Sequence, residues 1–174
     1  LDKKSSELIA YFYTDFTPRE GKYGHAAAFS LLSGRLKGGR YTPPASAIVA
    51  NFNPPANGKP SLLNHSEVET LFHELGHALH QILGCTDMPT LCGYHTKIDF
   101  LELPSQLMEE LMWEFDVLKQ LGHHYQTGES IPEELMRKKI SSRYLNEGYF
   151  TLYQMMLASI SLEYHKGESS AKNT

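Results

Sequence analysis

Residues 73 to 77 read His-Glu-Leu-Gly-His, and these residue types at this spacing can carry out hydrolytic chemistry. Two histidines four positions apart lie one turn apart on the same face of a helix, so both imidazoles can reach one metal ion. Glu74 projects about 100° round that helix, where its carboxylate can accept a proton from water beside the metal. The pattern therefore predicts a zinc peptidase site, with His73 and His77 as ligands and Glu74 as general base.

A catalytic zinc site usually has a third protein ligand, and the segment from Asp99 to Glu109 offers carboxylates for it. The metzincin pattern is excluded, because it requires a histidine where this chain has Leu83. Glu102 and Glu109 are seven residues apart and share one face of a helix, and Asp99 can cap the start of that helix. Spacing alone leaves Glu102, Glu109 and Asp99 as alternatives. Asp99 and Glu109 are also candidates to accept a hydrogen bond from a ligating histidine.

The helix that must carry the two histidines has clear boundaries. Asn64 and Glu67 form a capping box, and Gly84 is a natural stop, so we expect a helix over about 66–83. Apolar residues recur along it at three- and four-residue spacing and leave the motif histidines on the opposite side. Gly76 costs the helix about 1 kcal/mol relative to alanine, so we expect another element to approach the backbone there.

The rest of the chain divides into an N-terminal strand and loop region over 1–63, a helical zinc-site region over 64–165, and a polar tail over 166–174. We expect an α+β fold that is predominantly helical, with a small antiparallel sheet before the helices. Either the 45–52 or the 23–31 strand is expected to offer an edge to an extended peptide. The expected strands are 8–16, 25–32 and 45–52, with a Gly/Pro-rich stretch over 33–44, and the remaining helices are about 100–121, 132–145 and 147–165.

Composition narrows the classes of partner. The chain has 174 residues, 41% of them hydrophobic and 21% charged, with a net charge of −4, which is typical of a globular domain. A net negative charge with no basic cluster beyond residues 137–139 argues against a nucleic-acid partner. No apolar stretch reaches the roughly 18 residues of a membrane span, and no secretory signal opens the chain. We expect a cytoplasmic protein, and a piece of a longer enzyme because Leu1 is not methionine.

Two cysteines, Cys85 and Cys92, flank a loop that follows the expected metal helix. A disulfide between them is possible in an oxidising compartment, and a second metal site with Asp87 and His95 matches no familiar zinc spacing. Two free thiols are the expectation that suits a cytoplasmic protein best.

The segments Leu71–His80 and Asp99–Gln106 together resemble the thimet oligopeptidase family of zinc metallopeptidases, which includes neurolysin, oligopeptidase A and the mitochondrial intermediate peptidase. Residues 13–27, 49–53 and 63–70 also resemble the catalytic core of that family. The two zinc-binding segments are specific enough to identify the family. Its members are longer than this chain and hydrolyse short peptides inside a channel between two mainly helical halves.

The resemblance implies a role for each site residue. His73, His77 and Glu102 would bind one zinc ion, and Glu74 would be the catalytic base of a zinc-dependent endopeptidase that acts on short peptides. In the family, further transition-state donors come from a tyrosine- and histidine-bearing loop beyond the second zinc segment, and that loop has no match here. The alternative is therefore a fragment that binds zinc but is catalytically incomplete.

Overall fold

The computed structural model describes residues 7–166, which divide between Ser130 and Ile131 into two compact units. In the first, strands give way to helices at Asn64, as the sequence predicts. Apart from Lys166, the expected polar tail over 166–174 lies outside the described residues.

A three-stranded sheet opens the first unit, in the order β1-β5-β2. β1 (Tyr11–Asp15) runs parallel to the central strand β5 (Ala45–Val49), and β2 (Ala27–Leu32) runs antiparallel to it. The sheet is therefore mixed, and the expectation of a wholly antiparallel sheet was wrong. The long connection between β1 and β5 lets the two strands run in the same direction, which a tight hairpin does not allow.

The central place of β5 also settles one expectation about strand edges. Both edges of β5 are paired, so the 45–52 strand cannot offer an edge to a peptide. The outer edge of β2 is not paired with another strand among residues 7–166. Of the two strands considered, the one over 23–31 therefore has the free edge.

The Gly/Pro-rich stretch over 33–44 contains a short hairpin that the sequence reading missed. β3 (Arg35–Lys37) pairs with β4 (Arg40–Thr42). The turn between them is Gly38-Gly39, with φ of 59° and 76°. Two consecutive positive φ values suit glycine and match the twist of a two-residue hairpin turn.

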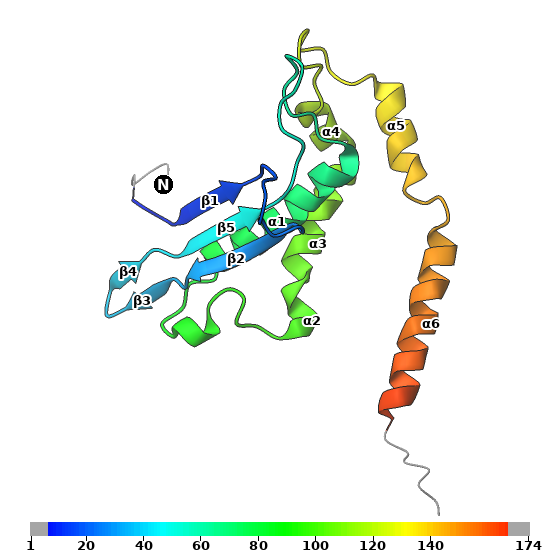
Figure 1. Ribbon diagram of the computed structural model, residues 1–174. Helices are drawn as coiled ribbons and strands as arrows, with labels where there is room; N and C mark the ends of the chain where they lie inside the picture. The colour runs from blue at the N-terminus through cyan, green and yellow to red at the C-terminus, as the bar shows by residue number, and fades with distance from the viewer. Residues whose placement is uncertain (1–6, 167–174) are drawn as a thin grey trace, which may run out of the picture. The chain divides into compact units, whose positions relative to one another are not determined.

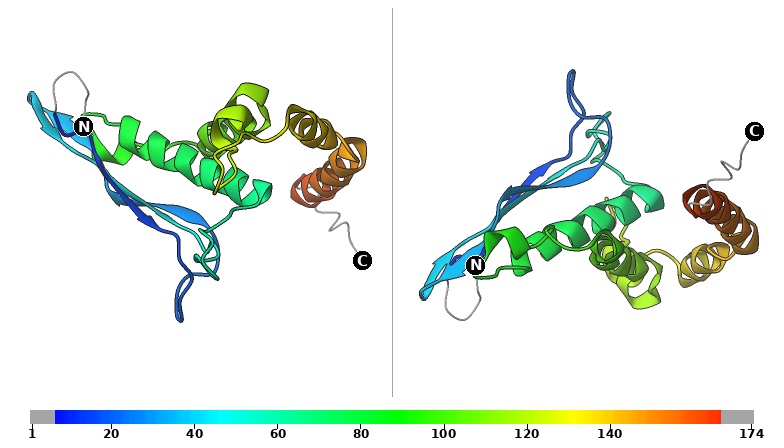
Figure 2. Two further views of the ribbon diagram at one scale, coloured as in Figure 1. Left: turned by 90° about the horizontal axis from the view of Figure 1, so that it is seen from above. Right: turned by 90° about the horizontal axis from the view of Figure 1, so that it is seen from below.

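Helix α1 (His65–Leu83) crosses the sheet (Figures 1 and 2). Its start confirms the predicted capping box: the Asn64 side chain accepts a hydrogen bond from the Glu67 backbone N–H at 3.0 Å, and the Glu67 carboxylate accepts one from the Asn64 N–H at 2.8 Å. On one side α1 is contacted by β5 and β2. On another side it is contacted by α3. The apolar stripe of α1 is only half-buried, and the most buried residues are instead Glu74, Gly76, Ala78 and Gln81.

The second helical segment was expected to be continuous over about 100–121, and the structure divides it. A break at Glu102 follows from Pro104, whose ring nitrogen cannot donate to the preceding turn. A second break lies just after Met112. The backbone oxygen of this residue is 3.0 Å from Nε2 of His65. The pieces are α2 (Ile98–Leu101), α3 (Leu103–Glu110), the 3-10 turn η2 (Leu111–Trp113) and α4 (Phe115–Leu121); a further 3-10 turn, η1 (Pro89–Leu91), precedes them.

The second unit consists of α5 (Glu133–Ser142) and α6 (Glu147–His165), close to the predicted helices. Asn146 ends the connection between them with φ of 64°, a left-handed conformation that asparagine tolerates. None of the residues of α6 is buried. Within residues 7–166, every helix is too short or too polar to traverse a lipid bilayer.

Candidate metal and catalytic site

Three side chains from two segments converge beside α1. His73 and His77 come from α1, and Glu102 lies at the junction of α2 and α3. One donor atom from each lies within 4.8 Å of the others: Glu102 Oε2 is 3.4 Å from His73 Nε2 and 3.1 Å from His77 Nε2. Tetrahedral zinc bonds of about 2.0–2.2 Å place their donors roughly 3.3 Å apart. The spacing and the nitrogen and oxygen donors therefore fit a zinc ion.

The closeness of Glu102 to the histidines depends on a glycine. A Cβ on Gly76 would lie 2.5 Å from the backbone oxygen of Pro104 and 2.5 Å from the Cα of Ser105. Only a residue without a side chain allows α1 and α3 to approach this closely. The sequence predicted that some element approaches Gly76, and the start of α3 is that element.

Ser105 holds the Glu102 carboxylate in place. Its side chain is fully buried, and its Oγ lies 2.7 Å from Oε2 of Glu102 and 2.9 Å from the Glu102 backbone oxygen. This hydrogen bond lowers the pKa of Glu102, and the nearby His77 and His73 lower it further. Glu102 is therefore a charged donor. Nothing in the spacing of the sequence singled out Ser105.

A second carboxylate, that of Glu109, contacts the ring nitrogen of His73 that does not face Glu102. Oε1 of Glu109 is in short hydrogen-bonding contact with Nδ1 of His73, so the Nδ1 proton is directed at Glu109 and the Nε2 lone pair faces Glu102. Of the two candidates for this role, Asp99 is exposed on α2 and has no hydrogen bond to either histidine among the described residues. A seven-residue spacing on one helix face brings Glu109 to the site, whereas the helix break turns Asp99 away.

Glu74 lies beside the group of donors. It is 7% exposed, and no described residue hydrogen-bonds its carboxylate. It projects from α1 at an angle to His73 and His77, so it is not part of the three-donor group. A carboxylate with both oxygens unengaged is available to accept a proton from a water molecule or substrate.

Tyr94, for which the sequence predicted no role, also lies in this region. The ring of Tyr94 packs against His77, with centroids 6.0 Å apart. Its hydroxyl is buried and meets no hydrogen-bond partner of good geometry among the described residues, although the Ser46 hydroxyl and the Glu74 carboxylate lie near enough to affect it; burial raises the pKa of Tyr94 to about 12. Tyr94 lies 17 residues beyond His77, in an irregular loop, so no periodicity could have linked the two.

The two cysteines are free, as the sequence predicts. Cys92 is fully buried, and its Sγ donates to the backbone oxygen of Gly34 at 2.9 Å. Burial raises the pKa of Cys85. Neither cysteine belongs to a group of potential metal donors among residues 7–166.

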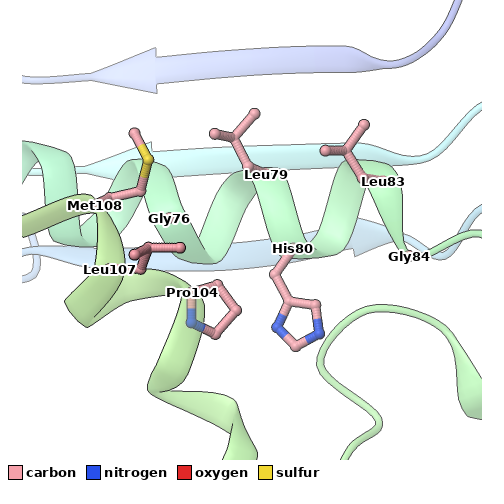
Figure 3. Close-up of a pocket in the computed structure, with 8 residues that line it drawn as sticks. All are labelled: Gly76, Leu79, His80, Leu83, Gly84, Pro104, Leu107 and Met108. Atoms are coloured by element: carbon pink, nitrogen blue, oxygen red, sulfur yellow. The ribbon is translucent and has the colours of Figure 1, made fainter. Parts of the chain in front are cut away.

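A separate apolar pocket of about 330 Å³ lies between α1 and α3 (Figure 3). Leu79 is two residues on from His77 and so projects to the far side of α1 from that ligand. The only ionisable residue in the wall is His80, whose pKa is lowered by burial and by His77. The pocket carries no carboxylate, so it offers an apolar surface rather than chemistry. Its walls are Gly76, Leu79, His80, Leu83, Gly84, Pro104, Leu107 and Met108.

Comparison with known proteins gives a single family. Residues 1–174 match the model described as Peptidase family M3. Saccharolysin from Saccharomyces cerevisiae is 39% identical over 166 residues, which are 94% of this chain and 23% of the relative. Oligopeptidase A from Escherichia coli is 37% identical over 167 residues, 95% of this chain and 25% of the relative. Mitochondrial intermediate peptidase from Arabidopsis thaliana is 41% identical over 136 residues, 78% of this chain and 19% of the relative. The chain thus spans about a quarter of the length of these relatives.

Proposed function

Since the chain belongs to peptidase family M3, we propose that it carries the metal-binding core of a zinc-dependent endopeptidase that hydrolyses internal bonds of short peptides. The observation that supports this most directly is the convergence of His73, His77 and Glu102 at distances that suit tetrahedral zinc. The names of the relatives, oligopeptidase A among them, support short peptides as the substrate class.

The proposed mechanism gives each residue one task. Bound zinc supplies Lewis-acid chemistry, since it lowers the pKa of water to about 7 and polarises a carbonyl. Glu74 accepts the proton of the attacking water on a free carboxylate oxygen and returns it to the nitrogen of the leaving amine. Such acid–base catalysis typically contributes about 10²- to 10⁴-fold to the rate. Glu109 keeps the proton of His73 on Nδ1, so that Nε2 remains a lone-pair donor.

The free edge of β2 supports a peptide substrate in extended form. A peptide that adds a strand there would be bound through main-chain hydrogen bonds, which tolerate many side chains. Methylating a backbone nitrogen of the peptide should then raise KM. An unchanged KM for every methylated position would remove β2 from the substrate site.

A comparison of the wild-type chain with one variant tests the function. We expect the purified chain to hold one zinc per molecule by elemental analysis, and to cleave a quenched fluorescent peptide in a way that a chelator stops. Glu74→Gln should keep the fold and the zinc, because the residue is not a ligand, and lose at least about 10²-fold in kcat with little change in KM. Full turnover by the glutamine variant would exclude Glu74 as the base.

A second candidate is a zinc-binding core that lacks turnover. The observation in its favour is that the chain spans about a quarter of the length of its relatives, so groups that act on the transition state can lie outside it. One zinc per chain with no peptide hydrolysis, in a protein that is otherwise folded, would favour this candidate over the first.

A further inference from the structure

Tyr94 stands edge-to-face with one of the proposed metal ligands. Its ring makes an angle of 87° with that of His77 at a centroid distance of 6.0 Å. It also meets His80 at 6.4 Å and 74°. Perpendicular ring pairs at these distances are favourable and restrict rotation of the partner. The His77 imidazole is thus flanked by an aromatic wall from outside its own helix.

The backbone of Tyr94 is attached to α1 through Gln81. The fully buried Gln81 side chain accepts the Tyr94 N–H at 3.3 Å and donates to the Leu32 carbonyl at the end of β2 at 3.4 Å. A Cβ on Gly93, which has φ of 50°, would lie 2.1 Å from Oε1 of Gln81. The loop backbone therefore sits directly on the amide of Gln81.

The other parts of the same loop are also anchored. The N–H of Gly93 donates to the Gly84 carbonyl at 3.1 Å, and the N–H of Leu36 in β3 donates to the Thr86 carbonyl at 3.2 Å. With the bond from Cys92 to Gly34, the loop over 84–95 is fixed to both α1 and the β3–β4 hairpin. Tyr94 is thus carried by an anchored loop.

The hydroxyl of Tyr94 does not explain this arrangement. It is buried and meets no hydrogen-bond partner of good geometry among the described residues; burial raises the pKa of Tyr94 to about 12, the nearby Ser46 hydroxyl opposes this shift and the Glu74 carboxylate adds to it. What reaches His77 is the ring. The contact between Tyr94 and His77 is therefore one of packing rather than of charge or proton transfer.

We propose that Tyr94 is a positioning residue for the metal site: its ring, held in place by Gln81, fixes the orientation of the His77 imidazole. The inference rests on the proposed function, because it takes His77 to be a ligand. A ligand that is already oriented loses less conformational freedom when it binds the metal, and this lowers Kd. By linkage, metal binding must stabilise the docked state of the loop to the same extent.

The test is the affinity of the full chain for Zn²⁺, measured by competition with a chromophoric chelator. Tyr94→Leu should raise Kd about 3- to 10-fold, the range that one aromatic pair supports, whereas Tyr94→Phe, which keeps the ring, should stay within about twofold of wild type. Phe100→Leu is the matched control, since Phe100 contacts His80, with centroids 5.9 Å apart. An unchanged Kd for Tyr94→Leu, or a loss in Tyr94→Phe equal to it, overturns the proposal.

A second variant covers the case in which Tyr94→Leu does not fold. Gln81→Met keeps the ring but removes the acceptor of the Tyr94 N–H, and should raise Kd and shift the absorption bands of bound Co²⁺. A Kd and a Co²⁺ spectrum identical to wild type would overturn the role of Gln81 and, with it, the proposal. A wild-type chain that binds no Zn²⁺ would instead refute the proposed function itself, so the two failures are distinguishable.

Discussion

Helices α1 and α6 are both 19 residues long, yet they differ in almost every way that fixes a helix in place. α1 begins with a capping box, packs against a sheet and a second helix, and buries four residues. α6 begins at Asn146 with no side-chain cap, and none of its residues is buried. Its apolar side chains point in all directions, and Tyr164 and Leu152 are 84% and 68% exposed.

The difference shows where the information for the site lies. On α1 the most buried side is polar or small, with Glu74 and Gln81 inside, because that side faces the sheet and the loop over 84–95. An apolar pattern on all sides is typical of a helix that is buried all round. The residues that position the site on α1 therefore all lie in the first unit. The apolar side chains of α6, by contrast, are not buried by the described part of their own unit.

The largest expected effect is the loss of metal from α1. Replacing His77 by alanine removes one of three donors, and the same holds for His73 and Glu102, so each variant should fail to retain stoichiometric zinc after dialysis, as measured by elemental analysis. His165→Ala on α6 is the control and should keep the metal. Full zinc in the alanine variant of Glu102 would move the third ligand to Glu109 or Asp99.

A smaller effect on zinc binding is expected for Glu109, which contacts a proposed ligand but is not one itself. Glu109→Ala removes the acceptor of the His73 Nδ1 proton and should weaken zinc binding by about 10- to 100-fold, the usual range for such partners. Glu109→Gln retains an acceptor and should lose less. Glu163→Ala on α6 should leave Kd unchanged. Equal Kd values for all four proteins would mean that Glu109 does not orient His73.

Gly76 in α1 and Gly148 in α6 test how tightly each of these two helices is packed. Gly76→Ala forces α1 away from α3 and should lower the free energy of unfolding by about 2 kcal/mol, even after the gain in helix propensity. Gly148→Ala in α6 meets nothing within 4 Å and should raise it by about 0.5–1 kcal/mol. Urea denaturation measures both. A cost at position 148 as large as that at 76 would show that α6 is packed after all.

The smallest expected effect concerns the two helix starts. Asn64→Ala removes a cap and should cost about 1 kcal/mol in the same urea experiment. Asn146→Gly should cost little or nothing, because its φ of 64° suits glycine and no side-chain cap is lost. If the two variants proved equally destabilised, the contrast between the two helix starts would have to be given up.

The sequence anticipated the parts of the fold that local chemistry determines. The Asn64 cap and the helices of the second unit follow from propensities that act within a few residues, and a glycine in the middle of a helix indicated the close approach at residue 76. The parallel pairing of β1 with β5 and the buried polar side of α1 depend on segments far apart in sequence, so periodicity could not reveal them. The continuous apolar spacing over about 100–121 concealed the break at Glu102, which depends on Pro104.

The same holds for the candidate site. The His-Glu-Leu-Gly-His pattern and the carboxylates after it could be found because a helix places them at fixed angles. Spacing left three carboxylates open for the third ligand, and the geometry brings Glu102 next to both histidines. Ser105, Gln81 and Tyr94 were missed, because their contributions depend on tertiary contacts and on an irregular loop that no pattern describes.

The contact between Gly76 and Pro104 has a consequence for which cations the protein can distinguish. It fixes the distance between two helices, and this distance sets the gap between the Glu102 oxygen and the imidazole nitrogens. A gap of 3.1–3.4 Å suits donors held tetrahedrally by bonds of about 2.0–2.2 Å, and it lets one carboxylate oxygen act together with two imidazole nitrogens, a donor set that suits Zn²⁺ and not Ca²⁺, which takes oxygen ligands. The absence of a methyl group at position 76 thus allows the two nitrogen donors to be combined with an oxygen donor, and this combination decides which cations are preferred.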